Sequence, residues 1–320
     1  MSCIYGPVPS RRLGQSLGVD PIPLKTCNYN CVYCQLGRTT PLTNERKEYV
    51  PCDDILAELG RVYAGLDSGS VDYVTIVGQG EPLLHSGIGR LVREARSITG
   101  RPVVVITNGS LLSLPDVRDG VREADLVIPS LDAADQETFL RISRPWPELR
   151  IRDVICGLET LRAESQARLW IEVMLLRGLN DSVEVLEDLA RAIERIRPEE
   201  VHLNLPVRPP AESWVEGADQ DGLLTAMAVL GSVARVVAPD CGLLVFRQDV
   251  PPLEAVLEII PRHPLRESDL AEALGGRGAD RTLTTLRQLA DHPLARRRVH
   301  RGEVFWTHAG AKTGCAGGSR

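Results

Sequence analysis

Three cysteines on one short segment are the residues best suited to chemistry. Cys27, Cys31 and Cys34 have the spacing Cys-x3-Cys-x2-Cys and come directly after a predicted strand. Three thiolates on so short a loop can ligate three irons of a cubane iron–sulfur cluster, leaving the fourth iron open to another ligand. A structural zinc site normally takes four protein ligands, and no nearby histidine supplies a fourth. The spacing therefore favours a cluster with one open iron.

The same spacing has a structural alternative. Offsets of four and seven residues also fit one face of a helix, so the three thiols could form a buried stripe. Asn28 and Asn30 lie between the cysteines, and such polar residues argue against that interpretation.

The cysteine segment lies within a series of strand and helix patterns. The predicted strands are Leu13–Asp20, Val71–Val77, Pro102–Thr107, Asp125–Leu131, Arg168–Leu176 and Val201–Pro206. The predicted helices are Asp53–Ala64, Ile88–Thr99, Pro115–Glu123, Gln136–Ile142, Ile151–Glu164, Val183–Arg197 and Gln220–Val237. Six strand–helix units in series predict a parallel α/β layer or barrel.

Active sites in such folds lie at the carboxyl ends of the strands. Polar residues follow the predicted strands there: Gly80 and Glu81, Asn108, Ser130 and Asp132, and Asn180. Asn108 precedes Gly109, and this pair serves turn geometry equally well. Glu81 follows the Gly78-Gln79-Gly80 turn and is the strongest functional candidate among these strand-end residues.

The cysteine motif, with Tyr33 before its last cysteine, resembles the signature of radical S-adenosylmethionine (SAM) enzymes. Gly80-Glu81-Pro82 is similar to that family's Gly-Gly-Glu-Pro element, although Gln79 stands where the first glycine is common. The resemblance implies a partial (β/α)6 TIM-type barrel, a 4Fe-4S cluster on the three cysteines and SAM as cofactor. It places Glu81 and Gly80 at the methionine amino group and Tyr33 against the adenine. Contacts to the ribose and the carboxylate fall to Asn108, Ser130, Asp132 and Asn180.

The resemblance also implies the reaction. An electron from the reduced cluster cleaves SAM to methionine and a 5′-deoxyadenosyl radical, which abstracts a hydrogen from the substrate. A reductant such as flavodoxin or ferredoxin is then a partner.

The C-terminal part of the chain has a different pattern. Helices are expected at Leu253–Ile260, Asp269–Leu274 and Arg281–Ala290, followed by a β-hairpin over Arg297–Trp306 that turns at Arg301-Gly302. This order resembles a winged helix-turn-helix. We expect a barrel over residues 1–249, a winged-helix-like domain over 250–310 and a flexible tail over 311–320. The third helix and hairpin carry Arg281, Arg287, Arg296, Arg297, Arg298 and Arg301. A structural cap with a solvated arginine face is the alternative.

Further motifs resemble a microbial branch allied to wyosine-type tRNA synthases: the segments 6–20, 130–133 and 177–181, and Arg144-Pro145. This resemblance implies a tRNA substrate. The synthases carry a second set of cysteines that is not found as a spaced motif here. They also condense pyruvate, a reaction that would use a lysine, so Lys25 beside the cysteines is a weak catalytic candidate.

Composition sets the wider limits. The chain has 320 residues, a formal net charge of −6 and eight cysteines. Without a visible secretory signal or a long apolar run, we expect reduced thiols, a cytoplasmic location and no membrane partner. The chain is acidic up to residue 249, whereas 11 basic and 8 acidic residues lie from Val250 to Arg320. This basic C-terminal part suggests a polyanionic partner.

Three functions remain open. The first is a radical enzyme that modifies RNA, which the C-terminal module would bind. The second is a glycyl-radical activase or another radical enzyme that acts on a peptide or protein. The third is a non-catalytic iron–sulfur redox sensor that binds DNA, which would leave Glu81 and the polar strand ends unexplained.

Overall fold

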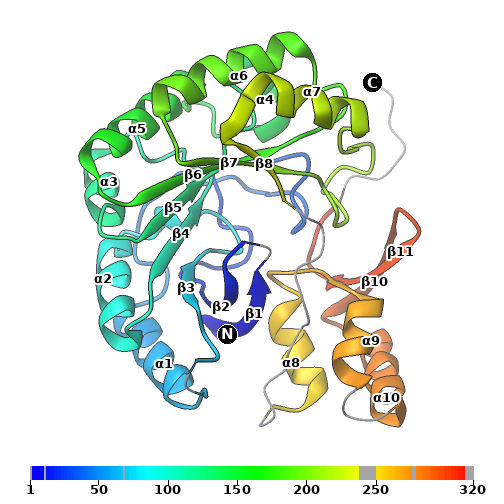
Figure 1. Ribbon diagram of the computed structural model, residues 1–320. Coiled ribbons are helices and arrows are strands. Elements are labelled where there is room, and N and C mark those ends of the chain that lie inside the picture. Colours follow the sequence, from blue (N-terminus) through cyan, green and yellow to red (C-terminus); the bar gives the residue numbers. More distant parts are fainter. Residues whose placement is uncertain (1, 11, 68, 238–249, 276–278, 314–320) are drawn as a thin grey trace.

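The computed structural model describes residues 2–10, 12–67, 69–237, 250–275 and 279–313. Within them, the chain forms a sheet of eight strands and a sheet of three strands (Figure 1). The larger sheet follows the sequence order: β1 (Ile4–Ser10), β2 (Gly14–Val19), β3 (Tyr73–Ile76), β4 (Val103–Thr107), β5 (Leu126–Pro129), β6 (Arg168–Met174), β7 (Glu200–Asn204) and β8 (Ala234–Val236). β1 is antiparallel to β2, and each later pair of neighbours is parallel.

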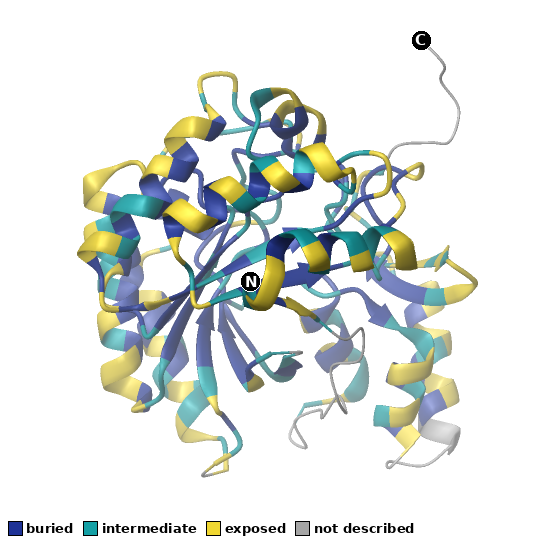
Figure 2. Ribbon diagram, turned by 45° about the horizontal axis from the view of Figure 1, so that its top comes forward, coloured by how far each residue is buried: buried dark blue, intermediate teal, exposed yellow. Residues whose placement is uncertain are grey.

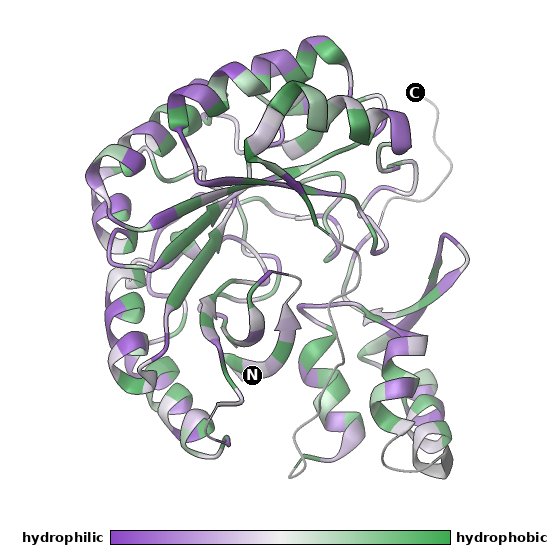
Figure 3. Ribbon diagram, in the orientation of Figure 1, coloured by the Kyte–Doolittle hydropathy of each residue, from purple (hydrophilic) through white to green (hydrophobic). Residues whose placement is uncertain are grey.

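Helices cover the outer side of this curved sheet. They are α1 (Cys52–Ala64), α2 (Ile88–Thr99), α3 (Pro115–Val121), α4 (Gln136–Ser143), α5 (Ile151–Glu164), α6 (Val183–Ile196) and α7 (Gln220–Leu230). The central strands β3 to β5 are mostly buried and apolar, while each outer helix alternates buried and exposed residues (Figures 2 and 3). Burial on both faces explains the continuous apolar runs of the central strands, such as Val103 to Val105 in β4.

Several helices begin where a side chain satisfies a free backbone N–H group. Asp135 accepts a hydrogen bond from Thr138 N (2.8 Å) at the start of α4, and Asp219 accepts one from Gly222 N (3.0 Å) at the start of α7. At the other end of α2, Gly100 has a φ of 63°, a left-handed conformation that glycine adopts without strain.

The six predicted strands appear as β2 to β7, so the α/β prediction is confirmed, but the sheet is larger than predicted. β1 contains Pro7 and Pro9, which are unusual in strands, and an edge strand tolerates them because one side needs no partner. The helix predicted over Gln220–Val237 was too long. It ends at Leu230 because Gly231 has a φ of 70°, and β8 follows.

The C-terminal module, residues 250–310 where described, has a hydrophobic core of its own that includes Val256, Leu270 and Trp306. It contains α8 (Pro252–Ile259), β9 (Leu265–Arg266), α9 (Glu267–Gly275), α10 (Ala279–Asp291), β10 (Ala295–His300) and β11 (Glu303–His308), with sheet order β10-β11-β9. The three predicted helices and the hairpin are present, and its turn is at Arg301-Gly302 as expected. β9 was not predicted.

The expected tail does not separate from the body at residue 311. Lys312 O accepts a hydrogen bond from Arg38 N (2.5 Å), and a side chain at Gly37 would collide with Lys312. Ala311 and Lys312 therefore pack against Gly37 and Arg38, which follow the three cysteines. Arg11, Cys241, Cys315 and the rest of the tail lie outside the described residues. None of the described helices combines the length and apolar character needed to cross a bilayer.

Candidate active site

A cavity of about 390 Å3 lies at the carboxyl ends of the strands. It brings together residues from the cysteine loop and from the carboxyl ends of five strands, β3 to β7. Its walls include Lys25, Cys27, Cys31, Tyr33, Cys34, Gly80, Glu81, Asn108, Ser130 and Asp132. Of the predicted site residues, Asn180 alone is not part of the cavity lining found among the described residues.

The cysteine loop is held against the loop that follows β3. Lys25 N donates to Gln79 O (2.7 Å), and Glu81 N donates to Thr26 O (2.9 Å). Gly80 lies between these bonds, where a Cβ atom would come within 1.8 Å of Thr26 O. Only glycine allows this close approach, so the sequence positions the thiols and Glu81 relative to one another.

The three thiols line one wall of the cavity. Burial raises the pKa of the Cys27 thiol to about 12 and that of Cys31 well above its usual value. Metal-free thiolates would be costly there, so a bound metal that replaces the thiol protons fits this donor set. Cys27 Sγ also accepts weak hydrogen bonds from Tyr29 N (3.4 Å) and Asn108 Nδ2 (3.8 Å). Lys25 Nζ donates to Cys34 Sγ (3.3 Å), which places a cationic side chain beside the thiols.

Glu81 is a buried carboxylate with three donors. Leu83 N (2.9 Å) and Thr107 Oγ1 (2.5 Å) donate to Oε1, and Asn108 N (2.7 Å) donates to Oε2. Burial nevertheless raises the pKa of Glu81 to about 7, against the lowering effect of these bonds. A buried carboxylate in a cavity wall is well suited to a cationic ligand, whose charge would favour the ionised form.

Asp132 is a second buried acidic residue in the cavity lining. Tyr33 OH donates to its Oδ2 (2.6 Å) and Met174 N to its Oδ1 (2.7 Å), while burial raises its pKa to about 6. The bond to Tyr33 ties the cysteine loop to the end of β5. Ser130, at the same strand end, is half-buried in the cavity wall.

Asn180 has a supporting position. Its Oδ1 accepts from Leu176 N (2.7 Å), and its Nδ2 donates to Asp132 O (2.8 Å) and Met174 O (2.9 Å). Three bonds to main-chain groups hold the loops after β5 and β6 together, and the side chain is fully buried. Asn180 therefore acts on the cavity through Asp132 and does not line it.

Asn108 has two structural duties. Its Nδ2 donates to Asn28 Oδ1 (2.8 Å). Its Oδ1 accepts from Ser110 N (2.9 Å), and this bond closes the turn around Gly109. The turn interpretation of Asn108-Gly109 is therefore confirmed, and Asn108 also lines the cavity, where its expected contact with the cofactor stays a prediction.

Sequence reasoning missed Glu172 in the cavity wall. Arg12 forms an ion pair with Glu172, and Asn204 Nδ2 donates to the same carboxylate (2.8 Å). The signal was a charged residue at alternating positions of the buried strand β6. Arg262 and His263 of the C-terminal module also line the cavity, and no local pattern points to them.

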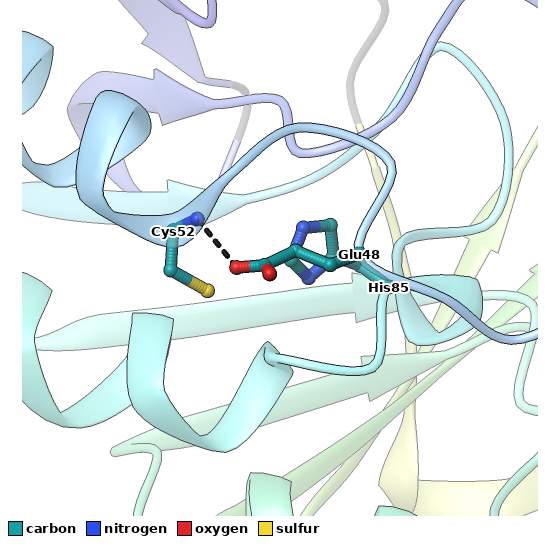
Figure 4. A group of neighbouring side chains, drawn as sticks. All are labelled: Glu48, Cys52 and His85. Atoms are coloured by element: carbon teal, nitrogen blue, oxygen red, sulfur yellow. Dashed lines mark hydrogen bonds between the residues drawn. The ribbon is translucent and has the colours of Figure 1, made fainter.

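A second group of potential ligands, Glu48, Cys52 and His85, lies apart from the cavity (Figure 4). The carboxylate of Glu48 accepts from Cys52 N (2.7 Å) at the start of α1. Both ring nitrogens of His85 have partners, Val50 O (2.8 Å) and Gly87 N (3.1 Å). Burial raises the pKa of the Cys52 thiol to about 12. Glu48 Oε1 and both ring nitrogens of His85, which could otherwise bind a metal, are already hydrogen-bonded. We therefore assign the group a structural role.

The comparisons with known proteins agree with this geometry. Residues 22–192, more than half of the chain, match the radical SAM superfamily, and the chain belongs to that superfamily. Its cofactors are a 4Fe-4S cluster and SAM. The superfamily resemblance seen in the cysteine motif is confirmed.

Individual relatives give a narrower view. A UPF0026 protein of Methanocaldococcus jannaschii is 32% identical over 280 residues, which cover 86% of this chain and 86% of that protein. A protein named GTPase Obg from Brachyspira hyodysenteriae is 43% identical over 200 residues, or 62% of this chain, but the match spans only 29% of that relative. A solved radical SAM methyltransferase from Sphaerobacter thermophilus has 19% identity and a TM-score of 0.49, over 72% of this chain and 70% of that one.

Proposed function

We propose that the protein is a radical SAM enzyme that modifies RNA, with tRNA as the substrate to test first. Cys27, Cys31 and Cys34 hold the cluster, and the C-terminal module binds the RNA. The observation that carries the proposal is that the three thiols, Glu81 and Asp132 line one cavity at the strand ends. A DNA-binding redox sensor would need the thiols but not the two buried carboxylates.

When bound here, the reduced cluster and SAM supply a 5′-deoxyadenosyl radical for hydrogen abstraction. The residues of the chain bind SAM and orient it. Glu81 pairs with the ammonium group of SAM, and the Asp132–Tyr33 pair and Ser130 line the part of the cavity where we place the nucleoside. An external one-electron donor such as flavodoxin or ferredoxin completes the system.

Lys25 is better placed for the cluster than for a condensation reaction. Its ammonium group donates to Gly37 O (2.6 Å) and to Cys34 Sγ (3.3 Å). A lysine that attacks a carbonyl must be neutral and free to move, whereas these bonds suit a charged, fixed group. We therefore assign Lys25 to balancing the negative charge of the cluster, and not to pyruvate chemistry.

The hairpin of the C-terminal module supports an RNA substrate. Arg296, Arg298 and His300 alternate on one face of β10, and Arg301 is in the turn. Arg298 Nη2 donates to Pro210 O (3.5 Å) and His300 contacts Pro206 O (3.4 Å), so this face leans on a loop whose Pro206 lines the cavity. Among the described residues, Arg298 Nη1 is buried without a hydrogen-bond partner. The exposed side chains of Arg296 and Arg301 are the ones that RNA phosphates can reach.

The test is binding of a fluorescent tRNA by anisotropy at several salt concentrations. Affinity should fall with salt, and Arg296→Gln and Arg301→Gln should each weaken binding severalfold and reduce the salt slope by about 1. Arg195→Gln, which removes a surface pair with Glu159 on the far side of the barrel, is the control. Salt-independent binding, or unchanged affinity in both hairpin variants, would refute the RNA assignment. Selective retention of one polypeptide would favour a protein substrate instead.

A further inference from the structure

The C-terminal module is connected to the SAM site by a buried chain of polar groups. Asp20, at the end of β2, has a fully buried side chain and lies between two donors. Arg262 Nε donates to its Oδ2 (2.8 Å), and Gln79 donates to the same carboxylate from Nε2 (2.7 Å) and from its backbone N (3.2 Å). Arg262 and Asp20 are 242 residues apart in sequence.

Gln79 passes this connection on to the cavity. It precedes Gly80 and Glu81, and its carbonyl accepts from Lys25 N (2.7 Å). The loop that carries Glu81 and the loop that carries the thiols are therefore both fixed to the residue that Asp20 holds.

A second bond reaches the cysteine loop directly. Gln35, next to Cys34, donates from Nε2 to Arg262 O (3.1 Å). The Arg262 side chain is 7% exposed, lies over the Tyr5 ring (4.8 Å) and donates to Ser2 O (2.5 Å). Arg262 is thus linked to the Glu81 loop through Asp20 and to the cysteine loop through Gln35.

We propose that docking of the C-terminal module sets the geometry of the SAM site, with Arg262 as a positioning residue that acts through Asp20 and Gln79. This inference rests on the proposed function, because it concerns the same cavity. Arg262 holds the Asp20 carboxylate in place, and Asp20 in turn fixes the amide of Gln79 and the start of the Glu81 loop. Weakening any link should lower SAM affinity without removing the cluster ligands.

The structure offers a variant for each link. Gln79→Met keeps the length of the side chain but removes its hydrogen bond, and leaves the Arg262–Asp20 pair intact. Arg262→Lys keeps the positive charge. Its single ammonium group cannot replace the planar guanidinium that donates to both Asp20 and Ser2 O. Arg297→Lys is the control, because Arg297 belongs to the same module but pairs with Glu267 on its surface (3.3 Å).

The experiment measures SAM binding by anaerobic equilibrium dialysis on the cluster-reconstituted full chain, together with its iron content. Gln79→Met and Arg262→Lys should each raise the Kd for SAM about tenfold with iron unchanged, and the control by less than about twofold. The double variant should bind SAM about as weakly as the weaker-binding single variant, because both changes interrupt the same series of hydrogen bonds.

Wild-type affinity in Gln79→Met would overturn the inference even if Arg262→Lys does not fold. Independent, multiplying effects in the double variant would also overturn it. Failure of the wild-type protein to bind SAM would instead overturn the proposed function, and the inference with it.

Discussion

Replacing Glu81 with glutamine should change how stability depends on pH. The carboxylate is buried, and its pKa of about 7 lies above the ordinary value of 4.5. The folded state therefore holds a proton that the unfolded state releases between these two values. By linkage, the stability of the wild-type protein falls as pH rises through this window. Glu81→Gln removes the titrating group and with it this fall.

The magnitude follows from the shift. A difference of 2.5 pKa units makes the wild-type protein lose about 2.5 kcal/mol relative to Glu81→Gln between pH 5 and pH 8. The variant also loses the bond from Asn108 N or those from Leu83 N and Thr107 Oγ1, because its amide NH2 cannot accept. That loss is the same at every pH. The change with pH in the difference in free energy of unfolding between the wild-type protein and the variant therefore reports the titration of Glu81 alone.

Urea unfolding of the SAM-free, cluster-free protein with reduced thiols, at pH 5, 6, 7 and 8, measures this difference. Parallel pH profiles, in which the difference changes by less than about 0.5 kcal/mol, would refute the buried-carboxylate argument. The same variant should lose SAM binding at every pH, because the anionic partner of the ammonium group is gone.

Three further outcomes are expected from urea unfolding and from iron analysis after reconstitution. Gly80→Ala should destabilise the protein by about 3 kcal/mol and impair cluster assembly, whereas Gly60→Ala in α1, where a Cβ atom would meet only the Ile98 side chain of α2 at 3.9 Å, should be neutral or stabilising; equal effects would contradict the close approach. Asn180→Ala should lower the free energy of unfolding by about 3 kcal/mol because three buried bonds are lost, and an unchanged midpoint would exclude its structural role. Asp132→Asn should keep full iron content but weaken SAM binding, so an unchanged SAM affinity would contradict the proposed role of Asp132 in binding the nucleoside part of SAM.

The central strands of the large sheet were predictable because their physical signals are local. Continuous apolar runs followed by polar residues mark β3 to β5, and the structure places these elements as expected. β1 was missed because its two prolines contradict strand propensity, and only its edge position makes them tolerable.

The candidate site shows the same division. The cysteine spacing and the Gly80-Glu81-Pro82 element could be read directly, since chemistry restricts those residue types. Arg262 could not, because its partner Asp20 is at the opposite end of the chain. Asn180 was placed in the right region, but sequence cannot distinguish a side chain that lines a cavity from one that supports the wall behind it.

The most direct test of the account is anaerobic cleavage of SAM. The protein is reconstituted with iron and sulfide, reduced, mixed with SAM and assayed for 5′-deoxyadenosine, alone and with tRNA. The wild-type protein and Cys156→Ala, which alters an exposed cysteine on α5, should produce it, and Cys34→Ala should not. Intact SAM in the presence of a spectroscopically confirmed cluster and tRNA would contradict the proposed enzyme.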